Sequence, residues 1–202
     1  LPWVTRRRLC DTGGMSLTFL LRLLAPLLLL AAGAAAADYD SYLTGNAADA
    51  RPARTTGGLL LSGGGGDNDD AFRWFVSCAG GGDIVILRAS GKDGYDDYLF
   101  TRIGGVDSVQ TLVFHRRAAS TDARVLEIIA GADGIFLAGG DQSNYIHYWK
   151  DTPVAAALDA HVRAGKPLGG TSAGLAVMGQ FVYSALEPRN LTSAIALQDP
   201  FD

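Results

Sequence analysis

Short apolar runs alternate with helical patterns along most of this chain, and this alternation constrains the fold more than any other feature. The runs are apolar throughout, as strands covered on both faces of a parallel sheet require. Between them, apolar residues recur at helical spacing, as Phe72, Phe75 and Val76 do. The expected strands lie within 58–66, 83–90, 108–114, 134–141 and 166–172. The expected helices lie within 67–80, 95–103, 121–132, 142–150, 152–165 and 173–185. This order predicts parallel βαβ units in a doubly wound, mostly parallel α/β sheet, a sandwich of three layers.

The loops that follow the expected strands are the places to look for a site. In a doubly wound sheet, ligands bind outside the carboxyl ends of the strands. Four loops meet that condition in this chain: Gly63–Asp70, Arg88–Gly94, Gly139–Ser143 and Gly170–Gly174.

The last of these loops carries a candidate nucleophile, Ser172. Gly170-Thr171-Ser172-Ala173-Gly174 fits the pattern G-x-S-x-G, with a strand expected before it and a helix after it. In that context the serine hydroxyl points out of the sheet, and the flanking glycines let the backbone crowd without a side-chain clash. The Ala173 N–H is then a candidate donor to an oxyanion. The alternative is a glycine-rich turn with an incidental serine.

A second loop is expected beside Ser172. Gly139 and Gly140 end the strand that precedes the serine strand in sequence, and backbone N–H groups there could complete an oxyanion hole. Gln142 and Asp141 are candidates to contact substrate. Asp141 has a second interpretation as the cap of the helix 142–150, and both roles can hold together.

These two stretches carry a family resemblance. GIFLAGGDQSNY followed by GGTSAGLAVMG resembles the cyanophycinase-like serine peptidases, peptidase family S51, which are related to aspartyl dipeptidase. The resemblance covers Gly57–Tyr183. It implies a class I glutamine-amidotransferase-like (flavodoxin-like) fold. It also implies Ser172 as the nucleophile, Gly140 and Ala173 at the oxyanion hole, and Gln142 at the substrate.

The chain departs from the family in its histidines. The family's catalytic histidine lies downstream of the serine, whereas His115, His147 and His161 all precede Ser172. We interpret His147 and His161 as structural or surface residues and expect the catalytic histidine beyond Asp202, in a protein that continues past this C-terminus. By resemblance, an acid follows the nucleophile helix, and Glu187 is the nearest candidate. Asp199 is a second candidate, and an exposed loop acid is the alternative for each.

The N-terminal region reads as a leader. Met15–Ala37 contains a single arginine, an apolar core and small residues at its end, which predicts a secretory signal peptide cleaved near Ala37. A retained membrane anchor is the alternative. We expect residues 1–14 to be an upstream artefact, 38–57 to be a flexible segment, and 58–202 to be an α/β peptidase domain that is incomplete at its C-terminus. The mature protein would be secreted or periplasmic, without stable membrane association.

Composition excludes several functions. The net charge of −4 gives no indication of nucleic-acid binding. Asp67, Asp69 and Asp70 follow the first glycine-rich loop and would repel a pyrophosphate, so a dinucleotide loop is not expected. They could instead form a rim that favours a basic substrate, or simply suit a helix N-terminus. Lys92 is a candidate for a substrate carboxylate, but a polar turn is the preferred interpretation. No metal or organic cofactor is expected.

The sequence therefore predicts a serine-type peptidase that cleaves a peptide or isopeptide bond of a small peptide or polypeptide through an acyl-enzyme on Ser172. Two alternatives remain open. One is an esterase of the α/β-hydrolase type, which shares G-x-S-x-G. The other is an exported binding protein, or a decayed enzyme, that retains the scaffold without catalysis.

Overall fold

The computed structural model describes residues 36–52, 54–186 and 194. The chain divides between Ala36 and Ala37 into two units, and every element below belongs to the second. The predicted segment 1–14, nearly all of the predicted leader, Glu187 and Asp199 lie outside the described residues. Among the helices of the described residues, none is long and apolar enough to cross a membrane.

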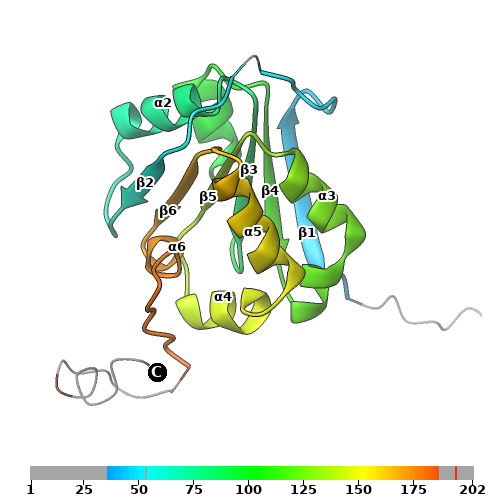
Figure 1. The fold of residues 1–202 in the computed structure, drawn as a ribbon, viewed down its shortest axis with the longest axis vertical. Helices are drawn as coiled ribbons and strands as arrows, with labels where there is room; N and C mark the ends of the chain where they lie inside the picture. The colour runs from blue at the N-terminus through cyan, green and yellow to red at the C-terminus, as the bar shows by residue number, and fades with distance from the viewer. Residues whose placement is uncertain (1–35, 53, 187–193, 195–202) are drawn as a thin grey trace, which may run out of the picture. The chain divides into compact units, whose positions relative to one another are not determined.

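Six strands form one sheet in the order β1-β4-β3-β5-β6-β2 (Figure 1). Their bounds are β1 Tyr39–Gly45, β2 Leu59–Ser62, β3 Asp83–Arg88, β4 Ser108–Phe114, β5 Gly134–Leu137 and β6 Leu168–Thr171. All pairs are parallel except β1 with β4, which is antiparallel. The register places Ile86 of β3 between Thr111 of β4 and Phe136 of β5. The carboxyl ends of β2, β3, β5 and β6 therefore meet at one edge of the sheet, as predicted.

Helices connect these strands at the expected places. Their bounds are α2 Asp69–Cys78, α3 Ala123–Gly131, α4 Gln142–Trp149, α5 Pro153–Arg163 and α6 Ala173–Ala176, with a π-helix η1 at Tyr98–Ile103 and a 3₁₀-helix η2 at Arg117–Thr121. Side-chain caps fix three helix starts: Asn68 accepts from the Ala71 N–H, Asp122 from the N–H groups of two residues of α3, and Asp141 from the Ser143 N–H.

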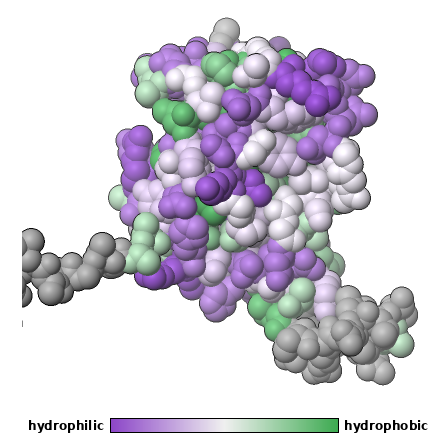
Figure 2. Space-filling view, turned by 180° about the vertical axis from the view of Figure 1, so that it is seen from behind, coloured by the Kyte–Doolittle hydropathy of each residue, from purple (hydrophilic) through white to green (hydrophobic). Residues whose placement is uncertain are grey.

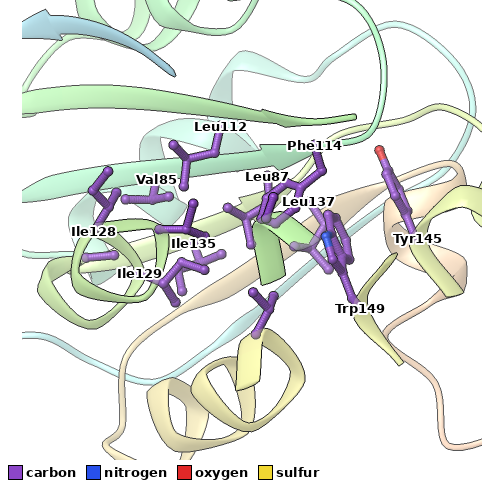
Figure 3. Close-up of a cluster of buried hydrophobic side chains, with 14 of the residues drawn as sticks. Val85, Leu87, Leu112, Phe114, Ile128, Ile129, Ile135, Leu137, Tyr145 and Trp149 are labelled. Atoms are coloured by element: carbon purple, nitrogen blue, oxygen red, sulfur yellow. The ribbon is translucent and has the colours of Figure 1, made fainter. Parts of the chain in front are cut away.

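Two hydrophobic clusters cover the two faces of the sheet. On one face, α2 and η1 bury Phe72, Phe75, Val76 and Leu99 against β3, β4 and β5. On the other face, α3, α4 and α5 pack over the opposite side chains of the same strands, and Figure 3 shows part of this cluster around Ile135. Helix α5 lies in front of the sheet in Figure 1. The surface seen from behind in Figure 2 is mostly hydrophilic. The doubly wound three-layer fold is thus confirmed.

Two local predictions were wrong. The segment 38–57 was expected to be flexible, but it begins with β1, whose seven residues pair with β4. An edge strand of mixed polarity lacks the continuous apolar run that marks a buried strand, so the pattern missed it. The helix expected over 173–185 ends at Ala176. Met178 donates its N–H to Leu175, which tightens the last turn, and Gly179 follows.

Candidate active site

Ser172 occupies the sharp turn between β6 and α6, and the residue is exposed. Its φ of 51° and ψ of −119° lie in a region that residues with a side chain rarely adopt. The turn is held on both sides, because the Ser172 N–H donates to the Ser62 carbonyl (3.2 Å) and the Ser172 carbonyl accepts from Ala176 (3.0 Å). A strained strand-to-helix turn of this kind presents a hydroxyl above the sheet, as a nucleophile requires.

The two glycines of the motif are explained by close backbone packing. A Cβ at Gly170 would lie 2.7 Å from the Gly174 carbonyl carbon, and a Cβ at Gly174 would overlap with the Leu137 carbonyl of β5. Helix α6 thus begins directly against the ends of β5 and β6. No larger residue fits at either position without moving the turn that carries Ser172.

Two glycine-rich loops flank the serine side chain. A Cβ at Gly139 would lie 3.4 Å from Ser172 Cβ, and a Cβ at Gly64 would lie 3.8 Å from Ser172 Oγ. The Thr171 hydroxyl donates to the Gly63 carbonyl (3.1 Å) and fixes the loop after β2. The loops after β2, β5 and β6 therefore meet at Ser172. Sequence reasoning did not single out Gly64 and Thr171 as neighbours, because their contacts join residues far apart in the chain.

The two predicted oxyanion donors are backbone N–H groups beside Ser172. Within the described part of the chain, neither the Gly140 N–H nor the Ala173 N–H donates to another protein group. Ala173 itself is buried, whereas the preceding Ser172 is exposed. Gly139, which precedes Gly140, lies against Ser172. Unpaired N–H groups beside an exposed serine are suited to stabilise a developing negative charge.

The next two candidates begin α4. Asp141 Oδ1 accepts from the Ser143 N–H (2.9 Å) and the Ser143 hydroxyl (2.7 Å), which confirms its predicted role as a helix cap. Gln142 is the first residue of α4 and is half-buried. Contact of either residue with substrate stays a prediction.

The loop after β3 is held by hydrogen bonds from Arg88, the last residue of that strand. Arg88 donates from Nη1 to the Lys92 carbonyl (2.6 Å) and from Nε to the Ser90 carbonyl. Lys92 and its neighbours are exposed, in agreement with the preferred interpretation of a polar turn. A Cβ at Gly140 would lie 3.4 Å from Ser90 Oγ, so this loop borders the predicted oxyanion hole.

The acidic residues after β2 are largely paired within the protein. Asp69 accepts from Arg102 (3.0 Å) and from the Tyr98 hydroxyl (3.0 Å), and Asp70 pairs with Arg73 (2.7 Å). These pairs favour the helix-terminus interpretation of both residues. Asp67 accepts from the Tyr95 hydroxyl (3.2 Å) and is exposed nearest the glycine loop.

None of the three histidines upstream of Ser172 is bonded to it in the described part of the chain. His161 is buried and its Nε2 bonds with the Pro167 carbonyl (3.0 Å), at the amino end of β6; burial lowers its pKa. His115 follows β4 and pairs with Asp40 (3.0 Å), and β3 and β5 separate β4 from β6. His147 is exposed on α4. Among the described residues, none of these histidines hydrogen-bonds with Ser172.

Two cavities lie away from Ser172. One, of about 370 Å³, opens at the amino ends of β3 and β4, between Asp83, Ser108 and Arg124. The other, of about 400 Å³, is lined by Ile146, Lys150, Gln180, Phe181, Val182, Ser184 and Leu186. In the part of the chain that the structure describes, no three His, Cys, Asp or Glu side chains gather as metal ligands would.

Comparison with known proteins matches this site to one family. Residues 96–188, which include both the Gly139–Gln142 loop and Ser172, match the sequence profile of peptidase family S51. The resemblance to peptidase family S51 is confirmed. The chain is 36% identical over 81 residues to a cyanophycinase of Trichormus variabilis, a match that covers 40% of this chain and 27% of the relative. It is 33% identical over 118 residues to a cyanophycinase of Geminocystis herdmanii, covering 54% of this chain and 43% of the relative.

A solved structure supports the fold. The crystal structure of a peptidase from an acI-B1 Actinobacterium superposes with a TM-score of 0.52 at 20% identity, covering 64% of this chain and 58% of that chain. At this identity the likeness concerns the fold alone. The chain spans less than half of the length of the cyanophycinases that it matches here.

Proposed function

We propose that this chain carries the nucleophile and oxyanion hole of a serine peptidase of family S51. The observation that carries the proposal is the backbone of Ser172, which is held at φ 51° with its side chain between two glycine-rich loops. Strain of this kind persists only where the surrounding structure enforces it, and it is concentrated at functional sites. The family match of the segment around Ser172 supports the same role.

The proposed reaction is acyl transfer. Ser172 Oγ attacks the carbonyl carbon of the scissile bond, and its proton passes to a general base. The carbonyl oxygen becomes an oxyanion that accepts hydrogen bonds from the Gly140 and Ala173 N–H groups. The same base returns the proton to the leaving amine as the C–N bond breaks. Water then attacks the acyl-enzyme, and Ser172 recovers its proton.

The base and its acid belong to the proposal as well. Because none of the three described histidines hydrogen-bonds with Ser172, we propose that the base is a histidine downstream of Asp202, with Glu187 as the acid that orients it.

The proposed substrate is an isoaspartyl-type peptide. The relatives named above are cyanophycinases, and that resemblance implies a substrate that carries arginine side chains on an aspartate backbone. Asp67 is exposed and follows Gly64, whose added Cβ would lie 3.8 Å from Ser172 Oγ, by three residues, and its negative charge suits a basic side chain.

The test is hydrolysis by the full-length protein and by Ser172→Ala. The substrates are β-aspartyl-arginine, its α-linked isomer, cyanophycin granules and p-nitrophenyl acetate. We expect wild-type protein to release amine from at least one aspartyl substrate and Ser172→Ala to lose at least about 10³-fold of that rate. Hydrolysis of the ester alone would indicate an esterase. No hydrolysis, with retained binding of an aspartyl substrate, would indicate a binding protein.

A further inference from the structure

The hydroxyl of Tyr145 is tied to the backbone of the loop that carries Gly140. Its single proton is shared between two acceptors, the Ala138 carbonyl (2.6 Å) and the Gly139 carbonyl (3.1 Å), in a bifurcated hydrogen bond. Both carbonyls belong to the segment that leaves the end of β5 and passes Ser172. A Cβ at Gly140 would lie 3.4 Å from the same hydroxyl, so the phenol also limits how close Gly140 can come.

Because the peptide bond is planar, the hydrogen bond to the Gly139 carbonyl also fixes the direction of the Gly140 N–H. The Gly139 carbonyl and the Gly140 N–H belong to one peptide plane, and in a trans peptide they point in opposite directions. The described residues contain no cis peptide bond. A hydroxyl that holds the Gly139 carbonyl on one side therefore turns the Gly140 N–H to the other side, away from Tyr145. Glycine at both positions leaves this plane free to rotate unless something holds it.

The tyrosine is itself fixed. Its ring stacks on Trp149 at a centroid distance of 4.4 Å and an angle of 8°, and Figure 3 shows the two rings together at the margin of the hydrophobic cluster. The side chain is only 1% exposed. Burial raises the pKa of the phenol to about 12, although the Arg88 guanidinium and the Ala89 backbone act against the rise. The hydroxyl consequently keeps its proton, and remains a donor, throughout the neutral range.

We propose that Tyr145 is a positioning residue for catalysis, whose hydroxyl holds the Gly139–Gly140 peptide so that the Gly140 N–H faces the oxyanion. This inference rests on the proposed function, since it assigns Tyr145 to the oxyanion hole of Ser172. Its action is indirect: Tyr145 touches the loop and not the reacting atoms. Loss of the hydroxyl frees the peptide plane and weakens the oxyanion hole in the transition state.

The test compares Tyr145→Phe with Tyr148→Phe in the full-length protein. Tyr148 lies on the same helix, but its backbone carbonyl, which accepts from Ser120, makes the tertiary bond. The probe is a fluorescent fluorophosphonate, whose P=O oxygen develops negative charge as the serine attacks phosphorus and fluoride departs. Labelling is followed over a range of probe concentrations, which separates the maximal rate constant from the half-saturating concentration. Melting temperatures are measured for each protein.

We expect Tyr145→Phe to lower the maximal rate constant about 10- to 100-fold with the half-saturating concentration unchanged, and Tyr148→Phe to change neither. Replacement of Tyr145 by 3-fluorotyrosine, which keeps the hydroxyl, should restore the rate. A wild-type maximal rate in Tyr145→Phe would overturn the inference while leaving Ser172 as nucleophile. A change confined to the half-saturating concentration would overturn it too. Absence of labelling in the wild-type protein would overturn both proposals. If a variant melts near the assay temperature, its labelling and that of the wild-type protein are compared at a lower temperature by the same criteria.

Discussion

The two ends of the same parallel strands are built differently. At the amino ends, several polar groups pair with one another: Asp83 accepts from the Ala50 N–H (2.7 Å), Asp133 accepts from the Asp83 N–H (3.0 Å), and Lys166 donates to the Ala132 carbonyl (2.6 Å). Asp107 Oδ2, just before β4, is the exception, since it is buried without a partner among the described residues. At the carboxyl ends, the Gly140 and Ala173 N–H groups donate to no other described residue.

This difference separates the groups that stabilise the sheet, at the amino ends, from the groups that could act on a substrate, at the carboxyl ends. Paired groups at the amino ends hold the strands in register. Unpaired donors and a strained serine cost stability, and they persist where close packing enforces them. The carboxyl-end loops are therefore the reactive edge, and changes at the two ends should separate stability from activity.

The largest effect is expected for Gly174→Ala. A methyl group at this position overlaps with the Leu137 carbonyl, so α6 must move away from β5. We expect a loss of more than about 4 kcal/mol in the free energy of unfolding, measured by urea denaturation, together with loss of Ser172 reactivity. Gly63→Ala is the control, because no heavy atom lies within 4 Å of its added Cβ. Equal stability of the two variants would refute the packing argument.

At the opposite end, Asp133→Ala should reduce stability alone. The change leaves the Asp83 N–H without its acceptor and removes the carboxylate that lies 3.4 Å from the Lys166 ammonium. We expect a loss of about 3 kcal/mol, with the labelling rate of Ser172 unchanged at temperatures where the variant is folded. Asp159→Ala, which removes an exposed pair with Arg163, should leave the free energy of unfolding nearly unchanged. A fall in labelling rate below the melting transition would show that the two ends are coupled.

Asp96 contrasts with the paired Asp133, because it is a buried carboxylate of which one oxygen has no partner among the described residues. Its Oδ1 accepts from Thr111, whereas Oδ2 has no partner among the described residues. Burial raises its pKa to about 6, with Asp93 and Asp97 adding to the rise and Thr111 and Arg88 opposing it. A carboxyl group whose pKa is higher in the folded protein than in the unfolded chain stabilises the fold at pH values below 3.8, the pKa in the unfolded chain. This stabilisation is lost as the pH rises through about 6, the pKa in the folded protein.

The corresponding measurement is the free energy of unfolding of wild type and Asp96→Asn between pH 4 and pH 8. We expect the difference to move by about 2 kcal/mol in favour of the asparagine variant across this range. A difference that does not depend on pH would show that Asp96 ionises as freely in the folded protein as in the unfolded chain.

The smallest effect is expected at the strained serine itself. Glycine adopts φ 51° and ψ −119° without a side-chain clash, whereas alanine keeps the clash. Ser172→Gly should therefore be about 1 kcal/mol more stable than Ser172→Ala by thermal unfolding. An alanine variant as stable as the glycine variant would mean that the turn is relaxed.

Much of this architecture was predictable from the sequence. The strands of the parallel sheet were marked by continuous apolar runs, and α2 by Phe72, Phe75 and Val76, because burial on both faces leaves a periodicity that needs no tertiary information. The edge strand β1 was missed because its residues are of mixed polarity, whereas β2, at the other edge, carries an apolar run. The role of Gly174 was anticipated as backbone crowding, although its partner Leu137 was not.

The site was predictable only in part. G-x-S-x-G located Ser172, since a sharp strand-to-helix turn imposes local glycine requirements. Tyr145 was missed because its partners are backbone carbonyls, which carry no mark in the sequence. The pairing of Asp69 with Arg102 was missed because it joins α2 to η1, which only the fold brings together.

The central claim is that Ser172 is a nucleophile, and its most direct test is covalent. Full-length protein is treated with a fluorophosphonate, and the adduct is located by mass spectrometry of peptides, with Ser172→Ala treated in parallel. The account predicts one phosphonyl group per chain, on the peptide that contains Ser172, and none on Ser172→Ala. An unmodified Ser172 in folded wild-type protein, or equal modification of the alanine variant, would contradict it.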